Sequence, residues 1–521
     1  MESYSFGSLP PDAEQKNTVF GGALNYRIPV FAAVSMMAGI ALSAALYFNG
    51  TAKIICYALL GLFLIVGIAL AVLKKRLYLP VALFLLLGFF IYDAQYSIYA
   101  TGTYETENAV ITGRVSRVER DFEDYHVYLI KDIRIDGATA KGGAYIYTKE
   151  TLFVGTGVSC LGKLYTFDWD PYNYVSVSHR KNGVKHIMYA DRVNIIPAEK
   201  KSGIFENIRE KIKFAYETNL GQEEAGIALS LVLGDKSLLT ENTNEYFMTS
   251  GLLHIFSVSG LHVGFLAAVI SFICKKTRLG RYAAFGISLA AMIIYAFITG
   301  FAPGMVRAIV MTASFYLGFL LFRRTDKLNS LALAAVIVLL INPMSLFEIG
   351  FQLSFTAVLG IICYYRPLKR ALSFGKTAPA RFVTNSLAMS LSANSMLFAV
   401  SANAFSVYGV YFCLANLVVV PIVSILYALL MFATITYLVF PSLGFLISVF
   451  NYPFMAITCI TRFIASLPGA LAGTSGLGLL AFVYVLTLFF MSRYVMIPQK
   501  IKYRALLGII GFSLVYAIVF L

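Results

Sequence analysis

The sequence predicts a polytopic α-helical membrane protein with about 12–13 spans and one small all-β domain inserted outside the membrane. Apolar residues make up 59% of the 521-residue chain and charged residues only 13%, against about 45–50% and about 25% in soluble globular domains. One polar, β-rich stretch of roughly a hundred residues interrupts the apolar background. This composition excludes a single water-soluble globular domain.

The N-terminal segment, residues 1–101, is predicted to cross the membrane three times. Its first twenty or so residues are polar and lack the charged-then-apolar pattern of a cleavable signal peptide. Apolar runs follow at residues 28–48, 54–73 and 77–92. Because basic loops stay in the cytoplasm, the cluster at residues 74–76 places the N-terminus in the cytoplasm and the next domain outside the cell membrane.

Residues 102–200 are predicted to form the extracytoplasmic β domain. Alternating segments bounded by Gly and Asp lie at residues 109–115, 126–130, 143–147 and 158–164, which is typical of a small antiparallel barrel or sandwich. Across this domain 13 basic residues are balanced by 13 acidic ones. The net charge of +15 of the whole chain therefore arises elsewhere.

Residues 201–250 form a predicted amphipathic helical connector, with no apolar run long enough to cross the membrane. Its apolar residues recur at helical spacing between charged ones, most clearly at residues 204–214. Such a helix either lies on the outer membrane surface or packs on the helical bundle.

Residues 251–521 are predicted to form the main transmembrane bundle, with roughly ten spans. This part holds 18 Lys and Arg against two acids, and 16 of the 18 lie in alternate breaks between apolar runs. That asymmetry follows the positive-inside rule, so most of the net charge orients the protein and does not mark a nucleic-acid surface. The run 408–440 is long and contains Pro421, which leaves room for a re-entrant or broken helix.

The densest polar cluster within an apolar run lies at residues 250–264. His254 and His262 are eight residues apart, which puts them roughly on one helix face, and Ser257 falls beside them. Histidines in membrane spans are costly unless they are paired or face water, so this cluster marks a functional pathway by default. Two other interpretations stay open: hydrogen bonds from both rings to backbone carbonyls, and a metal site without an evident third ligand.

Two later apolar runs also carry polar side chains. Pro303 suits a helix N-terminus, which puts Arg307 one turn inside the membrane, where it either snorkels to the surface or faces a polar interior. Glu348, Gln352 and Ser354 lie at the entrance of another span. Gln352 shares a helix face with Glu348, and an interhelical hydrogen bond is the simpler interpretation of that pair.

Three motifs, taken in this order, resemble the competence domain of the ComEC DNA-uptake channel family. They are residues 251–264, preceded by Leu-Gly-Asp-Lys at 233–236, then residues 299–308, and then residues 350–354. The similarity covers about residues 223–493, and the polar domain is similar to that family's extracytoplasmic OB-like domain. The resemblance implies passage of one DNA strand across the cytoplasmic membrane during natural transformation, with the outer domain handling the incoming DNA.

The same resemblance implies which residues line the DNA-translocation path. Its motif positions in this chain are His254, Ser257, Ser259, Gly260, His262, Arg307, Gln352 and Ser354. Single-strand grooves usually add stacking aromatics, although Tyr is also an ordinary strand residue. Six tyrosines of the outer domain are considered, Tyr125 and Tyr172 together with the selected Tyr145, Tyr147, Tyr165 and Tyr174. Within the spans, weak and distributed contacts suit conduction, and the amides available for them include Asn385, Asn394, Asn403 and Asn416.

The chain departs from many ComEC-type proteins because no metallo-β-lactamase-like domain is evident in it. Only five histidines occur, without a His-x-His-x-Asp-His string, so a two-metal nuclease of that type is not expected. The six cysteines include no CxxC pair, which argues against a disulfide framework or zinc ribbon. We expect no catalytic residue, metal or cofactor. The implied partners are single-stranded DNA, membrane lipid, a DNA receptor, a helicase or other ATPase, and a separate nuclease.

Two alternatives from other functional classes stay open on the sequence alone. One is a solute or lipid transporter built on the same bundle, although no clear inverted repeat is visible. The other is a membrane-embedded hydrolase that uses Ser257 or Ser259 with His254 or His262. Neither serine has an evident acidic residue to orient its base.

Overall fold

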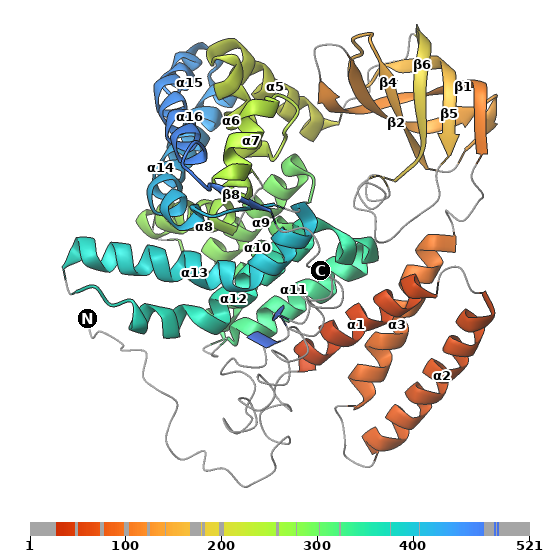
Figure 1. Cartoon of the computed structure of the whole chain (residues 1–521), viewed down its shortest axis with the longest axis horizontal. Helices are drawn as coiled ribbons and strands as arrows, with labels where there is room; N and C mark the ends of the chain where they lie inside the picture. Colours follow the sequence, from red (N-terminus) through yellow and green to blue (C-terminus); the bar gives the residue numbers. More distant parts are fainter. Residues whose placement is uncertain are drawn as a thin grey trace.

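The structure is a computed structural model of the chain, mostly helical, with one compact β-sheet domain beside the helices (Figure 1). The residues that it describes are 28–46, 50–72, 78–97, 104–121, 125–140, 142–166, 179, 183–196, 203–256, 260–277, 279–301, 303–321, 325–375, 377–405, 407–473, 484–485 and 487–488.

Three N-terminal helices correspond to the three predicted apolar runs: α1 (Ile28–Ala45), α2 (Gly50–Val72) and α3 (Tyr78–Ser97). Glycines let α1 and α3 approach closely. A Cβ atom at Gly39 would lie 2.1 Å from the Leu85 carbonyl oxygen, and one at Gly88 would lie 2.4 Å from the Met36 carbonyl oxygen. Small residues at such crossings allow the close backbone packing that holds membrane helices together.

Helix α2 is attached to α3 by a polar contact near one end of both helices. Lys53 Nζ lies 2.5 Å from Asp93 Oδ1, and the Tyr57 hydroxyl donates to Asp93 Oδ2 at 2.9 Å. The side chains of the ion pair are 17% and 23% exposed. Most of the remaining surface of α2 is exposed and apolar, so this contact is the main specific link between the two helices.

Replacing Lys53 with Met should lower the free energy of unfolding by about 1–3 kcal/mol, because Asp93 loses its cation partner. The loss stays below the about 3–5 kcal/mol of a fully buried pair because both groups retain some solvent exposure. The matched control is the double variant Lys53→Met/Asp93→Leu, which should recover most of the stability. Thermal unfolding in detergent measures both variants, and a double variant no more stable than Lys53→Met contradicts the assignment.

The β domain is a five-strand, barrel-like sheet. Its strands are β1 (Tyr104–Asp121), β2 (His126–Ile135), β3 (Ala138–Thr139), β4 (Gly143–Thr148), β5 (Gly157–Thr166) and β6 (Val184–Ile196). The pairing order β1-β5-β6-β4-β2 is closed by an additional β1–β2 pairing, and the short β3 extends β2. All pairs are antiparallel except β4–β6. The four segments predicted as strands lie in β1, β2, β4 and β5, whereas β6 is absent from the prediction.

The remaining helices form the larger body of the molecule. They are α5 (Ile204–Asn219), α6 (Gln222–Leu233), α7 (Glu241–Thr249), η1 (Leu253–Phe256), α8 (Gly260–Lys276), α9 (Arg281–Thr299), α10 (Pro303–Leu320), α11 (Lys327–Ile341), η2 (Pro343–Phe347), α12 (Ile349–Ala371), α13 (Ala378–Phe405), α14 (Phe412–Val439), η3 (Pro441–Leu443), α15 (Phe445–Ser448) and α16 (Asn451–Ala465). Two short strands, β7 (Val407–Gly409) and β8 (Leu471–Gly473), pair beside them. Helix α1 packs on α11 in a shared apolar cluster, which joins the N-terminal helices to this body.

The chain is a multi-pass membrane protein. Within the described residues, five helical segments are long and apolar enough to cross a membrane: Ile28–Ala45, Tyr282–Thr299, Ile349–Ala371, Phe412–Val439 and Pro441–Ala465. Four shorter apolar helices accompany them. The prediction of about 12–13 spans covers the whole chain, including stretches outside the described residues. Helix α14 runs without a break through Pro421, so the broken helix considered at that position is wrong.

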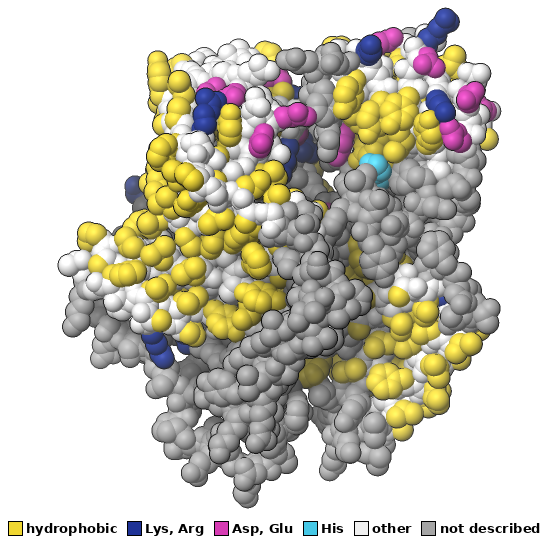
Figure 2. Space-filling view, in the orientation of Figure 1, with side chains coloured by type: hydrophobic (Ala, Val, Ile, Leu, Met, Phe, Trp, Pro, Cys, Tyr) yellow, Lys and Arg dark blue, Asp and Glu magenta, His cyan; other side chains and the backbone are white. Residues whose placement is uncertain are grey.

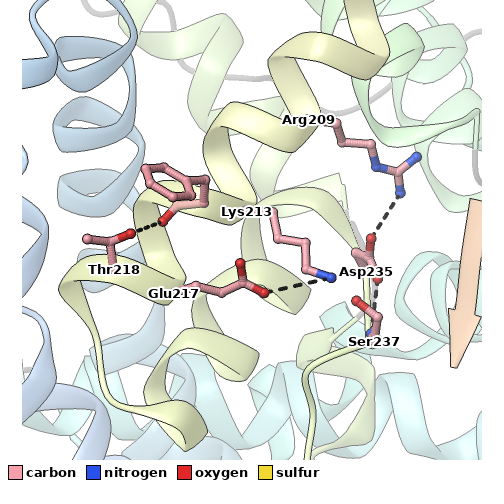
Figure 3. Close-up of polar contacts among 7 residues, drawn as sticks. Arg209, Lys213, Glu217, Thr218, Asp235 and Ser237 are labelled. Carbon is pink, nitrogen blue, oxygen red and sulfur yellow. Dashed lines mark hydrogen bonds and ion pairs between the residues drawn. The ribbon is translucent and has the colours of Figure 1, made fainter. Parts of the chain in front are cut away.

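Helix α5 packs on the helical body, which is the second of the two placements considered for the connector. Its buried residues Ile212, Ala215 and Tyr216 face the bundle, and the Tyr216 hydroxyl lies 2.6 Å from Thr434 Oγ1 of α14. Its charged face carries the ion pair Lys213–Glu217 at 3.8 Å (Figure 3). In Figure 2, charged side chains gather mostly on α5 and the β domain, while hydrophobic ones cover the other helices.

Figure 3 also shows how α5 is tied to the loop after α6. Arg209 Nη2 lies 3.7 Å from Asp235 Oδ2, and the same carboxylate caps the loop by accepting from the Ser237 backbone N–H at 3.0 Å. Asp235 belongs to the Leu-Gly-Asp-Lys motif at residues 233–236. One role of that motif is therefore structural, because it anchors the helix that follows the β domain.

Candidate functional site

Residues from all three sequence motifs meet at one side chain, the guanidinium of Arg307 in α10. Its Nη1 donates a hydrogen bond to the backbone carbonyl of Ser354 in α12. Gly260, the first residue of α8, lies on another side, where a Cβ atom would be 3.5 Å from Arg307 Nη2. Gly260, Arg307 and Ser354 therefore form one site, which we call the motif junction.

Arg307 is buried, with 7% of its surface exposed, so the snorkelling interpretation is wrong. Its guanidinium carbon lies 6.0 Å from the centroid of the Phe355 ring, a cation–π contact. Among the described residues, no carboxylate lies within ion-pair distance of it. The junction thus holds a cation in an apolar surrounding, where its charge is balanced by a carbonyl dipole and an aromatic face.

Among the described residues, the side chain of Gln352 bonds to the preceding turn and not to another membrane-crossing helix. Its Nε2 donates to the Leu346 carbonyl in η2 at 3.0 Å, and its backbone N–H bonds the Glu348 carbonyl at 3.0 Å. The amide side chain therefore fixes the turn that leads into α12. Glu348 is buried, at 9% exposure, and starts the helix that presents the Ser354 carbonyl to Arg307.

His254 and His262 do not share one helix, so the prediction of a common face is wrong. His254 lies in the 3-10 turn η1, whereas His262 lies in α8. Gly251, at a φ of +76°, turns the chain before η1. The imidazole of His254 retains accessible surface, yet the protein around it lowers its pKa because desolvation disfavours the charged form. Ser257 and Ser259, and the side chain of His262, lie outside the described residues.

Two of the predicted amides lie on α13 and accept hydrogen bonds from tyrosines of neighbouring elements. Asn394 Oδ1 accepts from the Tyr408 hydroxyl at 2.8 Å, and Asn385 Oδ1 accepts from the Tyr365 hydroxyl at 3.3 Å. Asn416 Oδ1 of α14 is buried without a hydrogen-bond donor among the described residues. The bundle thus presents neutral polar groups in addition to the one buried cation.

The selected tyrosines of the β domain separate into three groups. Tyr147 and Tyr165 are partly exposed and contact other aromatic rings. Tyr145 is 3% exposed and is covered by the His179 ring, whose centroid lies 5.0 Å away, so its selection as a stacking residue is wrong. Tyr174 lies outside the described residues. Tyr189, which the sequence reasoning missed, stacks on Tyr147 at 4.9 Å.

No group of three or more His, Cys, Asp or Glu side chains that could hold a metal ion occurs in the described part of the chain. The six cysteines all lie within the described residues and form no disulfide bond. The motif junction offers a fixed cation, the guanidinium of Arg307, which can bind and orient an anion.

Comparisons with known proteins agree with these motifs. ComE operon protein 3 from Bacillus subtilis (strain 168) is 28% identical over 225 residues, which is 41% of this chain and 28% of that protein. Recombination protein 2 from Haemophilus influenzae is 24% identical over 241 residues, or 44% of this chain and 30% of that protein. Competence protein ComA from Neisseria gonorrhoeae is 29% identical over 148 residues, or 26% of this chain and 21% of that protein.

The chain spans less than a third of the length of each of these three relatives. No solved structure matches it. The profile of the family described as Competence protein matches residues 231–496, just over half of the 521 residues, and this range holds Gly260, Arg307 and Ser354. The chain therefore belongs to the Competence protein family.

Proposed function

We propose that this chain passes a single strand of DNA across the cytoplasmic membrane during DNA uptake for natural transformation. The observation that carries the proposal is the buried Arg307 at the motif junction, without a carboxylate among the described residues to balance it. A charge at such a position is costly. An anion passing through the junction would offset that cost, and a DNA strand offers one phosphate per nucleotide.

Arginine suits this role better than lysine because its planar group bonds in several directions at once. One nitrogen is already engaged by the Ser354 carbonyl, which holds the group in place. The other terminal nitrogen, Nη2, lies on the side of Gly260, where a Cβ atom would be 3.5 Å from it. In the proposed path a phosphate oxygen approaches from this side.

The rest of the path would bind weakly. The tyrosine-bonded amides Asn385 and Asn394, and the buried Asn416, offer dipoles without charge. Conduction requires contacts strong enough to replace water and weak enough to release the strand at each step. A single fixed cation among neutral polar groups meets that requirement better than a row of lysines.

We propose that the β domain is an OB-like, extracytoplasmic domain that receives the incoming DNA, with the N-terminus in the cytoplasm. Its five strands close into a small barrel, an architecture that binds oligonucleotides in many unrelated proteins. The polar surface of the barrel and of α5 supports a position in water (Figure 2). Transport by this chain involves no covalent step, so strand degradation and ATP hydrolysis are assigned to partner proteins, and DNA capture is assigned to a receptor.

Deletion of the gene in a transformable host tests this function. Binding of labelled DNA at the cell surface and DNase-protected DNA inside the cell are measured separately. We expect surface binding to be retained and protected uptake to be lost, because capture precedes passage through the membrane. Complementation with the wild-type gene is the control. Unchanged protected uptake in the deletion strain refutes the proposal, and loss of a solute or lipid flux instead would favour a transporter.

A further inference from the structure

Four tyrosine rings lie in contact across the outer face of the β domain. Tyr125 and Tyr147 are near parallel, with centroids 6.1 Å apart and planes at 27°. Tyr147 and Tyr189 continue the stack at 4.9 Å and 29°. Tyr165 closes it edge-on, 5.8 Å from Tyr189. We call these four residues the tyrosine row.

The row is fixed by the register of three neighbouring strands. Tyr147 and Tyr189 are direct partners in the parallel β4–β6 pair, and Lys163 of β5 is the direct partner of Tyr189 on its other side. Next to Lys163, a Cβ atom at Gly162 would lie 2.0 Å from the Tyr189 carbonyl oxygen. Only glycine lets β5 and β6 approach so closely under the row. The rings of Tyr147, Tyr165 and Tyr189 are therefore held by backbone pairing, and Tyr125 directly precedes β2.

The exposed tyrosine row lies next to a buried apolar cluster. On the same face, Val127, Leu129, Tyr145 and Val184 are buried, and Tyr147 packs against them. His179 covers Tyr145, whereas Tyr125 and Tyr189 are 38% and 52% exposed. Figure 2 shows an exposed apolar patch on the β domain with charged side chains around it. Aligned exposed aromatic surface of this kind is typical of a binding site.

One end of the row carries a cation. Lys163 Nζ lies 5.2 Å from the Tyr165 ring centroid, 2.7 Å from Glu105 Oε1 and 4.0 Å from Glu107 Oε1. Hydrogen bonding to Glu105 raises the pKa of Lys163, so the ammonium is charged at pH 7. A ligand that fits must offer successive flat faces, and an anionic group on it can replace a carboxylate at Lys163. Nucleotides of a single strand have both features, whereas neutral sugars lack the anion and lipids lack the flat faces.

We propose that the tyrosine row stacks the bases of single-stranded DNA, with Lys163 contacting a phosphate; the inference rests on the proposed function for the choice of DNA as ligand. Every base has a π-face, so binding is tolerant of sequence. Because Lys163 is the one cation on the row among the described residues, the affinity depends only weakly on salt. The expected slope of log affinity against log salt is about −0.7, the value for one phosphate contact on a single strand.

The test uses the full chain in lipid nanodiscs and a fluorescent oligothymidylate, with binding measured by anisotropy. Tyr189→Ala should weaken binding about 5- to 150-fold, the range for loss of one stacked base. Tyr189→Phe keeps the ring and should bind within about twofold of wild type. The matched control is Phe153→Ala, which removes a ring that is 67% exposed elsewhere on the same domain and should change nothing. Equal melting temperatures of Tyr189→Ala and wild type exclude unfolding.

Three results would overturn the tyrosine row as a DNA site. They are wild-type affinity in Tyr189→Ala, displacement of the oligothymidylate by a neutral oligosaccharide, and a steep salt dependence that points to a different, basic surface. DNase-protected uptake in Arg307 variants tests the channel proposal independently. If these variants take up DNA normally while binding depends on Tyr189, the tyrosine row is supported as a DNA site and the channel proposal is refuted. If binding does not depend on Tyr189 while uptake requires Arg307, the channel proposal is supported and the tyrosine row is refuted as a DNA site.

Discussion

Cells that carry Arg307→Met in place of the wild-type protein are expected to lose DNase-protected uptake by about 30-fold or more, while the variant reaches the membrane in normal amounts. Removing one partner of a buried charged contact costs about 2–5 kcal/mol of binding free energy, and each 1.4 kcal/mol is a factor of ten. Met fills a volume similar to the Arg stem, so the loss reports the missing charge and hydrogen bonds.

The stability of Arg307→Met separates a transport role from a structural one. Arg307 is 7% exposed, and replacing a buried charge with an apolar residue of similar size is often neutral or stabilising. We expect a melting temperature equal to or above that of wild type, together with lost uptake. Arg307→Lys keeps the charge but not the planar fork, and it should retain part of the activity.

Arg462 provides the matched control for Arg307. It also lies in an apolar helix of the bundle, but it is exposed and lies at the end of α16, 5.0 Å from the Tyr246 ring centroid. Arg462→Met removes the same charge and should leave uptake within about twofold, because exposed charges contribute little. Normal uptake in Arg307→Met, or an equal loss in both variants, would remove the motif junction from the transport path.

The second large effect is expected at Gly360, where α12 and α13 cross. A Cβ atom at Gly360 would lie 2.2 Å from the Ser392 carbonyl oxygen and 3.2 Å from that of Ala393. A backbone carbonyl within a helix cannot move aside as a flexible side chain can. Gly360→Leu should therefore force the two helices apart and cost about 3 kcal/mol or more, at or above the upper end of overpacking substitutions. Thermal unfolding in detergent and the amount of protein in membranes measure this loss.

Gly286 of α9 is the control for Gly360. A Cβ atom there would meet nothing within 4 Å, and replacing a helical glycine with leucine raises helix propensity by nearly 1 kcal/mol. Gly286→Leu should thus be as stable as wild type or more stable. Because α12 also presents the Ser354 carbonyl to Arg307, Gly360→Leu should reduce uptake as well. A Gly360→Leu protein with wild-type stability would contradict the observed helix crossing.

The elements with strong local patterns could be predicted from the sequence. The three N-terminal helices, four of the main barrel strands and the helical connector follow from the length and spacing of apolar residues, which are local properties. Strand β6 escapes prediction because Asp191 and Arg192 interrupt its alternation near the middle. Tyr189 was missed for that reason, although its partner Tyr147 was selected.

The surroundings of the candidate functional side chains could be predicted from the sequence less well. Tyr145 and Tyr147 share one face of β4 by alternation, but Tyr145 is buried in the cluster of Val127, Leu129 and Val184 beside the His179 ring, whereas Tyr147 is partly exposed. His254 and His262 are eight residues apart, which fits one helix face, but the chain turns at Gly251 and α8 begins only at Gly260. Spacing along the sequence predicts a shared face only when both residues lie in the same helix, and it does not predict where α8 begins.

The sequence by itself determined that this protein is a multi-pass membrane protein with an inserted β domain, because hydropathy and charge bias are summed along the chain and do not depend on packing. Its motifs also led to the Competence protein family. Only the tertiary structure decided that Gly260, Arg307 and Ser354 meet at one buried cation. Contacts between residues 47 or more positions apart depend on how helices cross, and helix crossings are set by close packing of small residues that no local pattern records.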